Sequence, residues 1–217
     1  VAKNGTTLAK CQNPKLSTPK SMRTKGLSAS ALRQFSLRKR IRVINMVPEQ
    51  IVTNELIVKS KTVRGIVVSD PQKDILKIAV VERHKNSGRV GVGFVKGFNL
   101  KYGALASSVA HDSHNIIVVG VSDEDMIKAV NDIIKMDGGM VVVAKGKTVS
   151  SLPLPIAGLM SNDTAENVAN RHSKICDDAK KLGCKLSDPF LQLSFLALPV
   201  IPALKITDKG LVDANKM

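Results

Sequence analysis

The stretch NIIVVGVSDEDMIKAVNDIIKMDGGMVVVA, residues 115–144, decides the fold of this 217-residue chain. The apolar run at 115–121 predicts a strand. Ser122 is a helix cap with Asp125 at the capping-box position. Apolar residues then recur at helical spacing until a Gly-Gly pair ends the helix, and 140–144 predicts a second strand. The stretch therefore predicts a βαβ-like unit whose helix packs one apolar face on a sheet.

Segments on both sides extend this unit into an α+β domain. Residues 40–46 alternate charged and apolar side chains, which is typical of a half-exposed strand. Further strands are predicted at 51–61, 63–69, 75–83 and 89–95, and a second helix at 164–182 with Asp163 as its cap. Because strands come first and helices later, we expect a mixed, largely antiparallel β-sheet packed with a few helices.

Composition excludes several classes of protein. The three cysteines are odd in number and have no CxxC spacing, which argues against a disulfide framework and a zinc knuckle. Aromatic residues make up only 3%, so stacking platforms for single-stranded nucleic acid are not expected. The sequence shows no apolar secretory segment and no stretch near the roughly 18 residues of a spanning helix. We therefore expect a cytoplasmic protein with buried or idle thiols and no membrane partner.

Positive charge is concentrated at the N-terminal end. Residues 1–42 contain eleven Lys or Arg and no acid, so only +4 of the net +15 lies in the rest of the chain. Such an arm fits binding to nucleic acid or an acidic surface, an organellar transit peptide, or a solvated linker. Within it, 1–8 predicts a hairpin with an Asn-Gly turn and 9–30 predicts a linker.

The stretch SSVAHDSHN, residues 107–115, gathers the most reactive side chains just before the predicted strand at 115–121. Hydroxyls, a carboxylate, an amide and two imidazoles can bind metal, move protons or hold a heterocycle. A metal would need a third protein ligand, for which the sequence offers only the unanchored His84 and His172. Spacing alone does not separate such a site from a hydrogen-bonded polar turn that caps a strand.

Three other motifs favour structural roles. GVGFVKG at 91–97 has its third glycine one residue late for a dinucleotide loop, so it predicts a bulged strand or a close backbone approach. The apolar, proline-broken segments 152–161 and 198–204 predict buried loops packed against a partner domain or subunit rather than central strands. His172 falls on the inner face of the second helix, which favours a satisfied core histidine.

Three segments together resemble one family. They are GALASSVAHDSHN at 103–115, LPLPIAGLM at 152–160 and LPVIPALKITDKGL at 198–211. They resemble the C-terminal domain of adenine deaminase of the bacterial and archaeal kind, in the amidohydrolase superfamily, over about residues 30–217. The resemblance implies that 31–217 is this domain and that 1–30 is the tail of a preceding β-sandwich plus a basic linker.

The resemblance also implies an activity. Enzymes of this family hydrolyse adenine to hypoxanthine and ammonia, with a divalent metal, manganese or iron, held in a barrel through a His-x-His pair. This chain has no His-x-His pair and is shorter than the roughly 250 residues of such a barrel. No metal ligand is carried over, so we expect this chain alone to bind no metal and to be inactive. The implied partners are the amidohydrolase barrel of the same protein and adenine. From the apolar proline-broken segments we also expect further copies of the chain, and from the scarce aromatic residues no nucleic acid.

For the site, the resemblance implies that the loop reaches the mouth of the barrel. The predicted catalytic residues are His111, Asp112 and His114, and the predicted substrate-binding residues are Ser107, Ser108 and Asn115. They would hydrogen-bond the purine or close its pocket against water. Two alternatives stay open: a basic module that binds nucleic acid or an acidic partner, and a stand-alone metal hydrolase built on His111 and His114.

Overall fold

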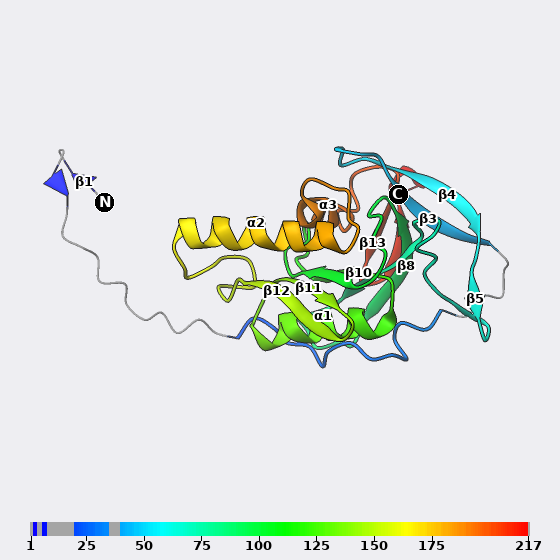
Figure 1. The fold of residues 1–217 in the computed structure, drawn as a ribbon, viewed down its shortest axis with the longest axis horizontal. Coiled ribbons are helices and arrows are strands. Elements are labelled where there is room, and N and C mark those ends of the chain that lie inside the picture. The colour runs from blue at the N-terminus through cyan, green and yellow to red at the C-terminus, as the bar shows by residue number, and fades with distance from the viewer. Residues whose placement is uncertain (1, 4–5, 8–19, 35–39, 217) are drawn as a thin grey trace.

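An eight-stranded sheet forms the centre of the structure, a computed structural model that describes residues 2–3, 6–7, 20–34 and 40–216 (Figure 1). Its strand order is β12-β11-β9-β10-β7-β8-β3-β4, and every neighbouring pair is antiparallel except β3 with β8. The strands are β3 (Arg40–Met46), β4 (Thr53–Lys59), β7 (Leu76–Val81), β8 (Val90–Lys96), β9 (Ala104–Ser107), β10 (Ile116–Gly120), β11 (Gly139–Ala144) and β12 (Lys147–Pro153). The α+β class predicted from the sequence is confirmed.

The strand–helix–strand unit is present with one addition. Helix α1 (Asp123–Lys135) follows β10, and the Ser122 hydroxyl accepts a hydrogen bond from the Asp125 amide at 3.2 Å. Because β10 and β11 both run antiparallel to β9, they run parallel to each other with β9 inserted between them. The predicted βαβ-like unit is therefore confirmed, whereas β9 was not predicted.

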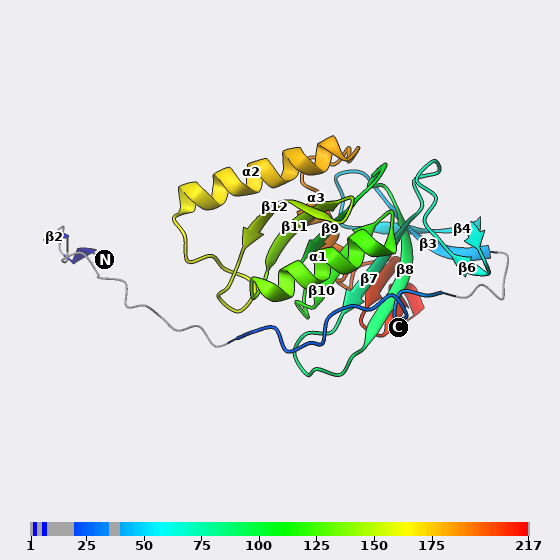
Figure 2. The same ribbon diagram turned by 60° about the horizontal axis from the view of Figure 1, so that its bottom comes forward.

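The sheet is covered on both faces (Figure 2). Helix α1 covers one face. The other carries α2 (Ala165–Lys181), the short helix α3 (Pro189–Phe195) and the hairpin of β13 (Leu204–Thr207) and β14 (Gly210–Asp213). In β10, Ile117 and Val119 contact the α2–α3 side, while Ile116 and Val118 contact α1. This alternation explains why the strand is apolar throughout, since both of its faces are buried.

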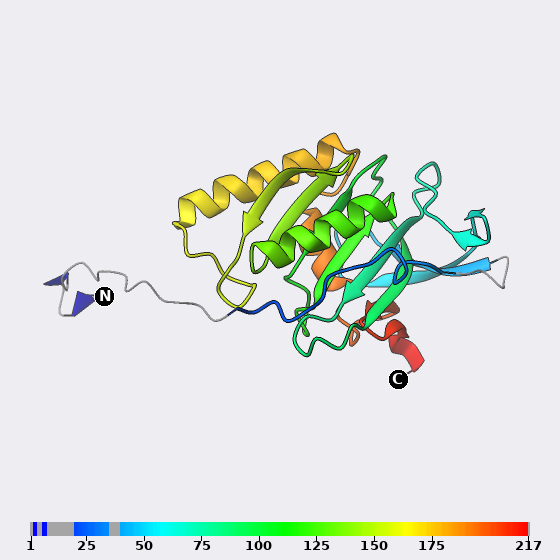
Figure 3. The ribbon, with the colours of Figure 1, turned by 90° about the horizontal axis from the view of Figure 1, so that it is seen from below.

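Residues 20–34 pack against the same face as α1 (Figure 3). Leu27 and Leu32 are buried there, and the Arg23 amide donates to the Arg83 carbonyl at 2.9 Å. Part of the segment predicted to be a linker is thus packed on the domain, and the boundary at residue 30 stays a prediction. Farther upstream, β1 (Ala2–Lys3) pairs with β2 (Thr6–Thr7) as the predicted hairpin, whose turn lies outside the described residues.

Two predicted elements need correction. The strand at 63–69 is instead a small hairpin of β5 (Thr62–Val63) and β6 (Ile66–Val67). Its turn residues Arg64 and Gly65 both have positive φ, which suits a tight hairpin turn and interrupts a continuous strand. The N-cap of α2 is Thr164 rather than Asp163, because the Thr164 hydroxyl accepts from the Asn167 amide at 3.3 Å.

The glycine motif of β8 allows a close backbone approach, as predicted. A Cβ atom on Gly91 would lie 1.9 Å from the carbonyl oxygen of Thr207, in the β13–β14 hairpin. The β7–β8 register is regular, so the bulged strand that the sequence also allowed is absent from this pair.

The proline-broken segment at 152 begins in β12, which is an edge strand, and Leu152 and Leu154 are buried. No helix within the described residues is long and apolar enough to cross a membrane.

Candidate functional site

The loop of residues 108–115 connects β9 to β10 and folds back on itself at one end of the sheet. The His114 amide donates to the Ala110 carbonyl at 2.6 Å, and the Ala110 amide donates to His114 Nδ1 at 3.3 Å. The His111 amide donates to the carbonyl of Ser194 in α3 at 3.2 Å. Backbone bonds thus fix where the two imidazoles lie.

The imidazoles form a pair that is only half-buried. Their ring centroids are 5.7 Å apart, and the His111 ring also lies 5.1 Å from the ring of Phe195. Burial lowers the pKa of His114, and the nearby His111 and Arg83 lower it further, so His114 is neutral at pH 7. Because Nδ1 already accepts a hydrogen bond, the proton of the neutral ring lies on Nε2, which is a donor.

Between the two histidines, Asp112 and Ser113 are exposed. The turn therefore presents a carboxylate acceptor beside imidazole groups that can donate or accept protons. These are the groups that general acid–base chemistry and recognition of a nitrogen heterocycle require.

The other three predicted site residues are buried and already bonded to protein groups. The Ser108 hydroxyl donates to the Gly158 carbonyl at 2.6 Å and accepts from the Gly139 amide at 2.8 Å. The Ser107 hydroxyl accepts from the Val109 amide at 3.0 Å. The Asn115 amide group accepts from the Arg83 amide at 3.3 Å and donates to Asp208 at 3.5 Å. The structure thus places five of the six predicted residues on the loop and Ser107 at the end of β9, and it gives these three internal partners.

Arg83 is a residue of this site that the sequence did not single out. It is 2% exposed, and its guanidinium donates to the carbonyls of His114, Ser21 and Ala157. The register explains its position, because Val81 pairs with Ile116 and so Arg83 comes opposite His114. The sequence predicted strands at 75–83 and 115–121, but it did not show that these strands pair. Without that pairing, nothing in the sequence places Arg83 beside His114.

Through these bonds the three segments that carried the family resemblance converge. Ser108 and Arg83 reach the 152–160 segment at Gly158 and Ala157, and Asn115 reaches Asp208 of the 198–211 segment. Asp208 in turn pairs with Arg89 at 2.7 Å. Hydrogen bonds from distant parts of the chain therefore meet at the end of the sheet that carries the loop.

A cleft of about 570 Å³ opens beside the loop. Its lining residues include His84, Ser113, His114, Ile156 and Leu159, but not His111 or Asp112. His84 Nε2 lies 2.7 Å from the Ser113 carbonyl oxygen. His84, one of the two histidines that the sequence offered as a third ligand, is therefore a neighbour of the loop. The volume lies within the range of roughly 300–1,000 Å³ that small-molecule sites occupy.

The histidines of the loop do not belong to a three-residue metal-binding group within the described residues. Within the described residues, one group of three side chains can hold an ion, and it consists of His172, Cys176 and Asp188. His111, Asp112 and His114 do not belong to it. His172 is therefore no core histidine, since its side chain is 35% exposed and faces Cys176 and Asp188. The prediction of a core histidine was therefore wrong, and His172 belongs to a different cluster from the histidines of the loop.

Comparison with known proteins gives a consistent result. Residues 50–217 match the family described as adenine deaminase C-terminal domain. The chain is 58% identical over 174 residues to an adenine deaminase of Desulfatibacillum aliphaticivorans, covering 80% of this chain and 31% of that protein. It is 50% identical over 196 residues to one of Brucella anthropi, covering 90% and 35%.

A third relative covers the whole chain. An adenine deaminase of Methanothrix thermoacetophila is 46% identical over 217 residues, which is 100% of this chain and 38% of that protein. The chain thus spans about a third of the length of the curated relatives it matches. From the family match and these relatives together, the chain belongs to the adenine deaminase C-terminal domain family.

Proposed function

We propose that this chain is the C-terminal part of a metal-dependent adenine deaminase that hydrolyses adenine to hypoxanthine and ammonia. The relatives that support this carry the name adenine deaminase and are about two and a half times as long as the chain. The amidohydrolase barrel, with the manganese or iron ion, would then lie in the remaining length. The observation that carries the role of this chain is the half-exposed His111–His114 turn beside its cleft.

In this proposal the turn supplies polar groups to the purine. The exposed Asp112 carboxylate can accept from the exocyclic amino group of adenine, and the Nε2 proton of His114 can be donated to a ring nitrogen. The Asp112 carboxylate can also take a proton from the attacking water and pass it on to the departing ammonia, as general acid–base catalysis requires. The family's metal would be held by residues of the barrel and not by this loop.

Ser107, Ser108 and Asn115 take a different part in the proposal. Their predicted contact with substrate stays a prediction. Their hydrogen bonds favour a positioning role, in which Ser108 and Asn115 hold the loop on Gly158 and Asp208 and Ser107 accepts from the Val109 amide within it. A loop held in this way keeps its imidazoles in place without ordering them anew in each catalytic cycle.

The test uses the full-length enzyme with His111→Asn, His114→Asn and Asp112→Asn as separate variants. Removal of an acid–base group should lower kcat about 10²-fold or more, whereas loss of a substrate contact alone should raise KM. Asp177→Asn is the matched control, because Asp177 is an exposed aspartate on α2. Unchanged kcat and KM in all three loop variants would leave the loop with a structural role only.

A further inference from the structure

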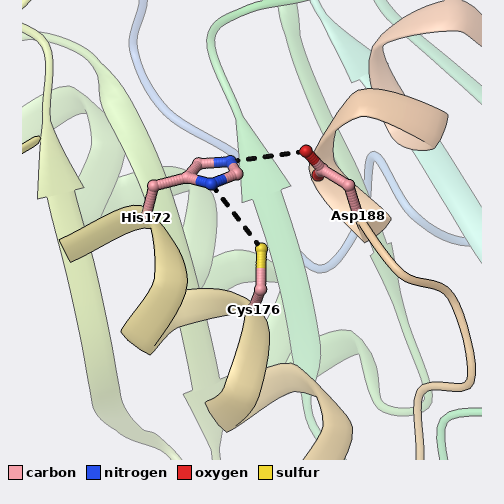
Figure 4. A group of neighbouring side chains, drawn as sticks. All are labelled: His172, Cys176 and Asp188. Atoms are coloured by element: carbon pink, nitrogen blue, oxygen red, sulfur yellow. Dashed lines mark hydrogen bonds and ion pairs between the residues drawn. The ribbon is translucent and has the colours of Figure 1, made fainter. Parts of the chain in front are cut away.

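A second cluster of reactive side chains lies where α2 faces the start of α3 (Figure 4). His172 and Cys176 come from α2, and Asp188 is the N-cap residue of α3. His172 Nδ1 lies 4.0 Å from Cys176 Sγ, and His172 Nε2 lies 3.6 Å from Asp188 Oδ2. One ligand atom from each residue lies within 4.8 Å of the others.

The fold fixes all three side chains in this arrangement. Residues four apart on a helix share a face, so His172 and Cys176 point the same way from α2. Asp188 is held by its cap, in which Oδ1 accepts from the amides of Phe190 at 3.1 Å and Leu191 at 2.9 Å. Its other oxygen, Oδ2, is left facing the histidine.

We propose that His172, Cys176 and Asp188 form a binding site for a zinc-like divalent cation that joins α2 to α3. Imidazole, thiolate and carboxylate are the ligand types that zinc takes, and three protein ligands leave a fourth position for water. The thiolate disfavours hard cations such as magnesium and calcium.

The geometry needs only a small adjustment to accept the ion. Zinc bonds of about 2.0–2.3 Å place tetrahedral ligand atoms roughly 3.3–3.8 Å apart. Because the His172 side chain is 35% exposed, its ring can turn to offer one nitrogen without disturbing the core. On binding, a metal–sulfur bond replaces the S–H bond of Cys176 and the proton goes to solvent. The ion's two positive charges are then balanced by the thiolate and the carboxylate.

The position of the cluster links it to the loop. Helix α3 is capped by Asp188 at its start, while Ser194 and Phe195 at its end contact His111. An ion between α2 and the cap would therefore fix the helix against which the His111 ring rests. The consequence is a structural role for the metal, with an effect on stability that does not depend on the proposed deaminase activity.

The test is cobalt(II) titration of the full 217-residue chain in a Cys11→Ser background, which leaves two thiols. We expect one cobalt per chain with a near-ultraviolet thiolate-to-cobalt charge-transfer band that zinc abolishes by displacement. Cys176→Ser should remove the band, and His172→Ala should weaken binding at least tenfold. Cys184→Ser is the matched control, because Cys184 is also buried but lies outside the group.

Zinc-dependent thermal unfolding gives a second readout on the same proteins. Zinc should raise the unfolding midpoint of the background chain and of Cys184→Ser, but not that of His172→Ala, whose half-exposed site tolerates truncation. The absence of the charge-transfer band in the background chain would overturn the proposal. So would a band of equal strength in Cys176→Ser, since it would place the ion elsewhere.

Discussion

The two faces of the sheet are built in different ways. The face under α1 takes most of its buried residues from one continuous segment, β10–α1–β11, and β7, β9 and residues 20–34 supply the rest. The opposite face joins parts from across the chain, as when the Thr53 hydroxyl donates to the Leu204 carbonyl at a sequence separation of 151. Local periodicity predicts the helix and two of the strands of the first face, whereas the second face depends on how closely distant backbones can approach.

The largest effect should come from closing such an approach. Gly91→Ala would place a Cβ atom 1.9 Å from the Thr207 carbonyl oxygen, so the β13–β14 hairpin must move. We expect a loss of about 3 kcal/mol in the free energy of unfolding, at the upper end of overpacking effects. Urea denaturation of the full chain measures it.

A matched control separates this clash from backbone strain. Gly88 has a positive φ of 73° but nothing within 4 Å of an added Cβ, so Gly88→Ala tests strain alone. It should cost only about 1 kcal/mol. A larger loss for Gly88→Ala than for Gly91→Ala would contradict the view that the hairpin's approach limits the second face.

Arg83 joins elements that the sheet alone does not bring together. Its removal should cause the second-largest loss in the free energy of unfolding. Arg83→Met keeps much of the side-chain volume but leaves the carbonyls of His114, Ser21 and Ala157 without their donor. We expect a loss of about 2 kcal/mol in the free energy of unfolding. Amide hydrogen exchange should also speed up in residues 110–115, where the loop loses its anchor.

Arg83→Lys distinguishes charge from geometry. Lysine keeps the positive charge but cannot reach three carbonyls in the planar arrangement of a guanidinium. It should recover less than half of the stability lost in Arg83→Met. Full recovery would show that charge, and not the fork of donors, holds the loop.

These contrasts explain what could be predicted from the sequence. The cap at Ser122 and the apolar spacing of α1 depend on neighbours a few residues away, and the predicted helix is confirmed. The hairpin at Arg64 and Gly65 was missed because the apolar residues around the turn resemble one strand. At the loop, the residues were predicted but not their partners. The role of Arg83 depends on the pairing of β7 with β10, and His172 meets Asp188 only because the chain reverses after α2.

Glu82 provides a pH-dependent test of the loop's surroundings. Burial alone would raise its pKa, but hydrogen bonds from Ser87, Lys85 and His84 lower it to about 2 from an ordinary 4.5. Since the folded pKa is depressed, the stabilisation is complete above the ordinary pKa and is lost as pH falls from about 5 to about 2. Glu82→Gln should therefore cost about 1–2 kcal/mol at pH 7 and almost nothing near pH 2.

The measurement is urea denaturation at several pH values for both proteins. Glu166→Gln is the control, because Glu166 is exposed on α2. A constant difference between the original chain and Glu82→Gln from pH 7 to pH 2 would mean that shape, rather than ionisation, explains the role of this side chain.

The smallest effect should arise on the continuous face. Ser122→Ala removes the acceptor for the Asp125 amide, and loss of a helix cap costs about 1 kcal/mol. Ser122→Asp should keep the stability, since its carboxylate also accepts that bond and favours the positive end of the helix. In hydrogen exchange, Ser122→Ala should expose the first turn of α1 and leave residues 110–115 unchanged. Faster exchange in the loop would show that the two faces are coupled through β10, which both of them share.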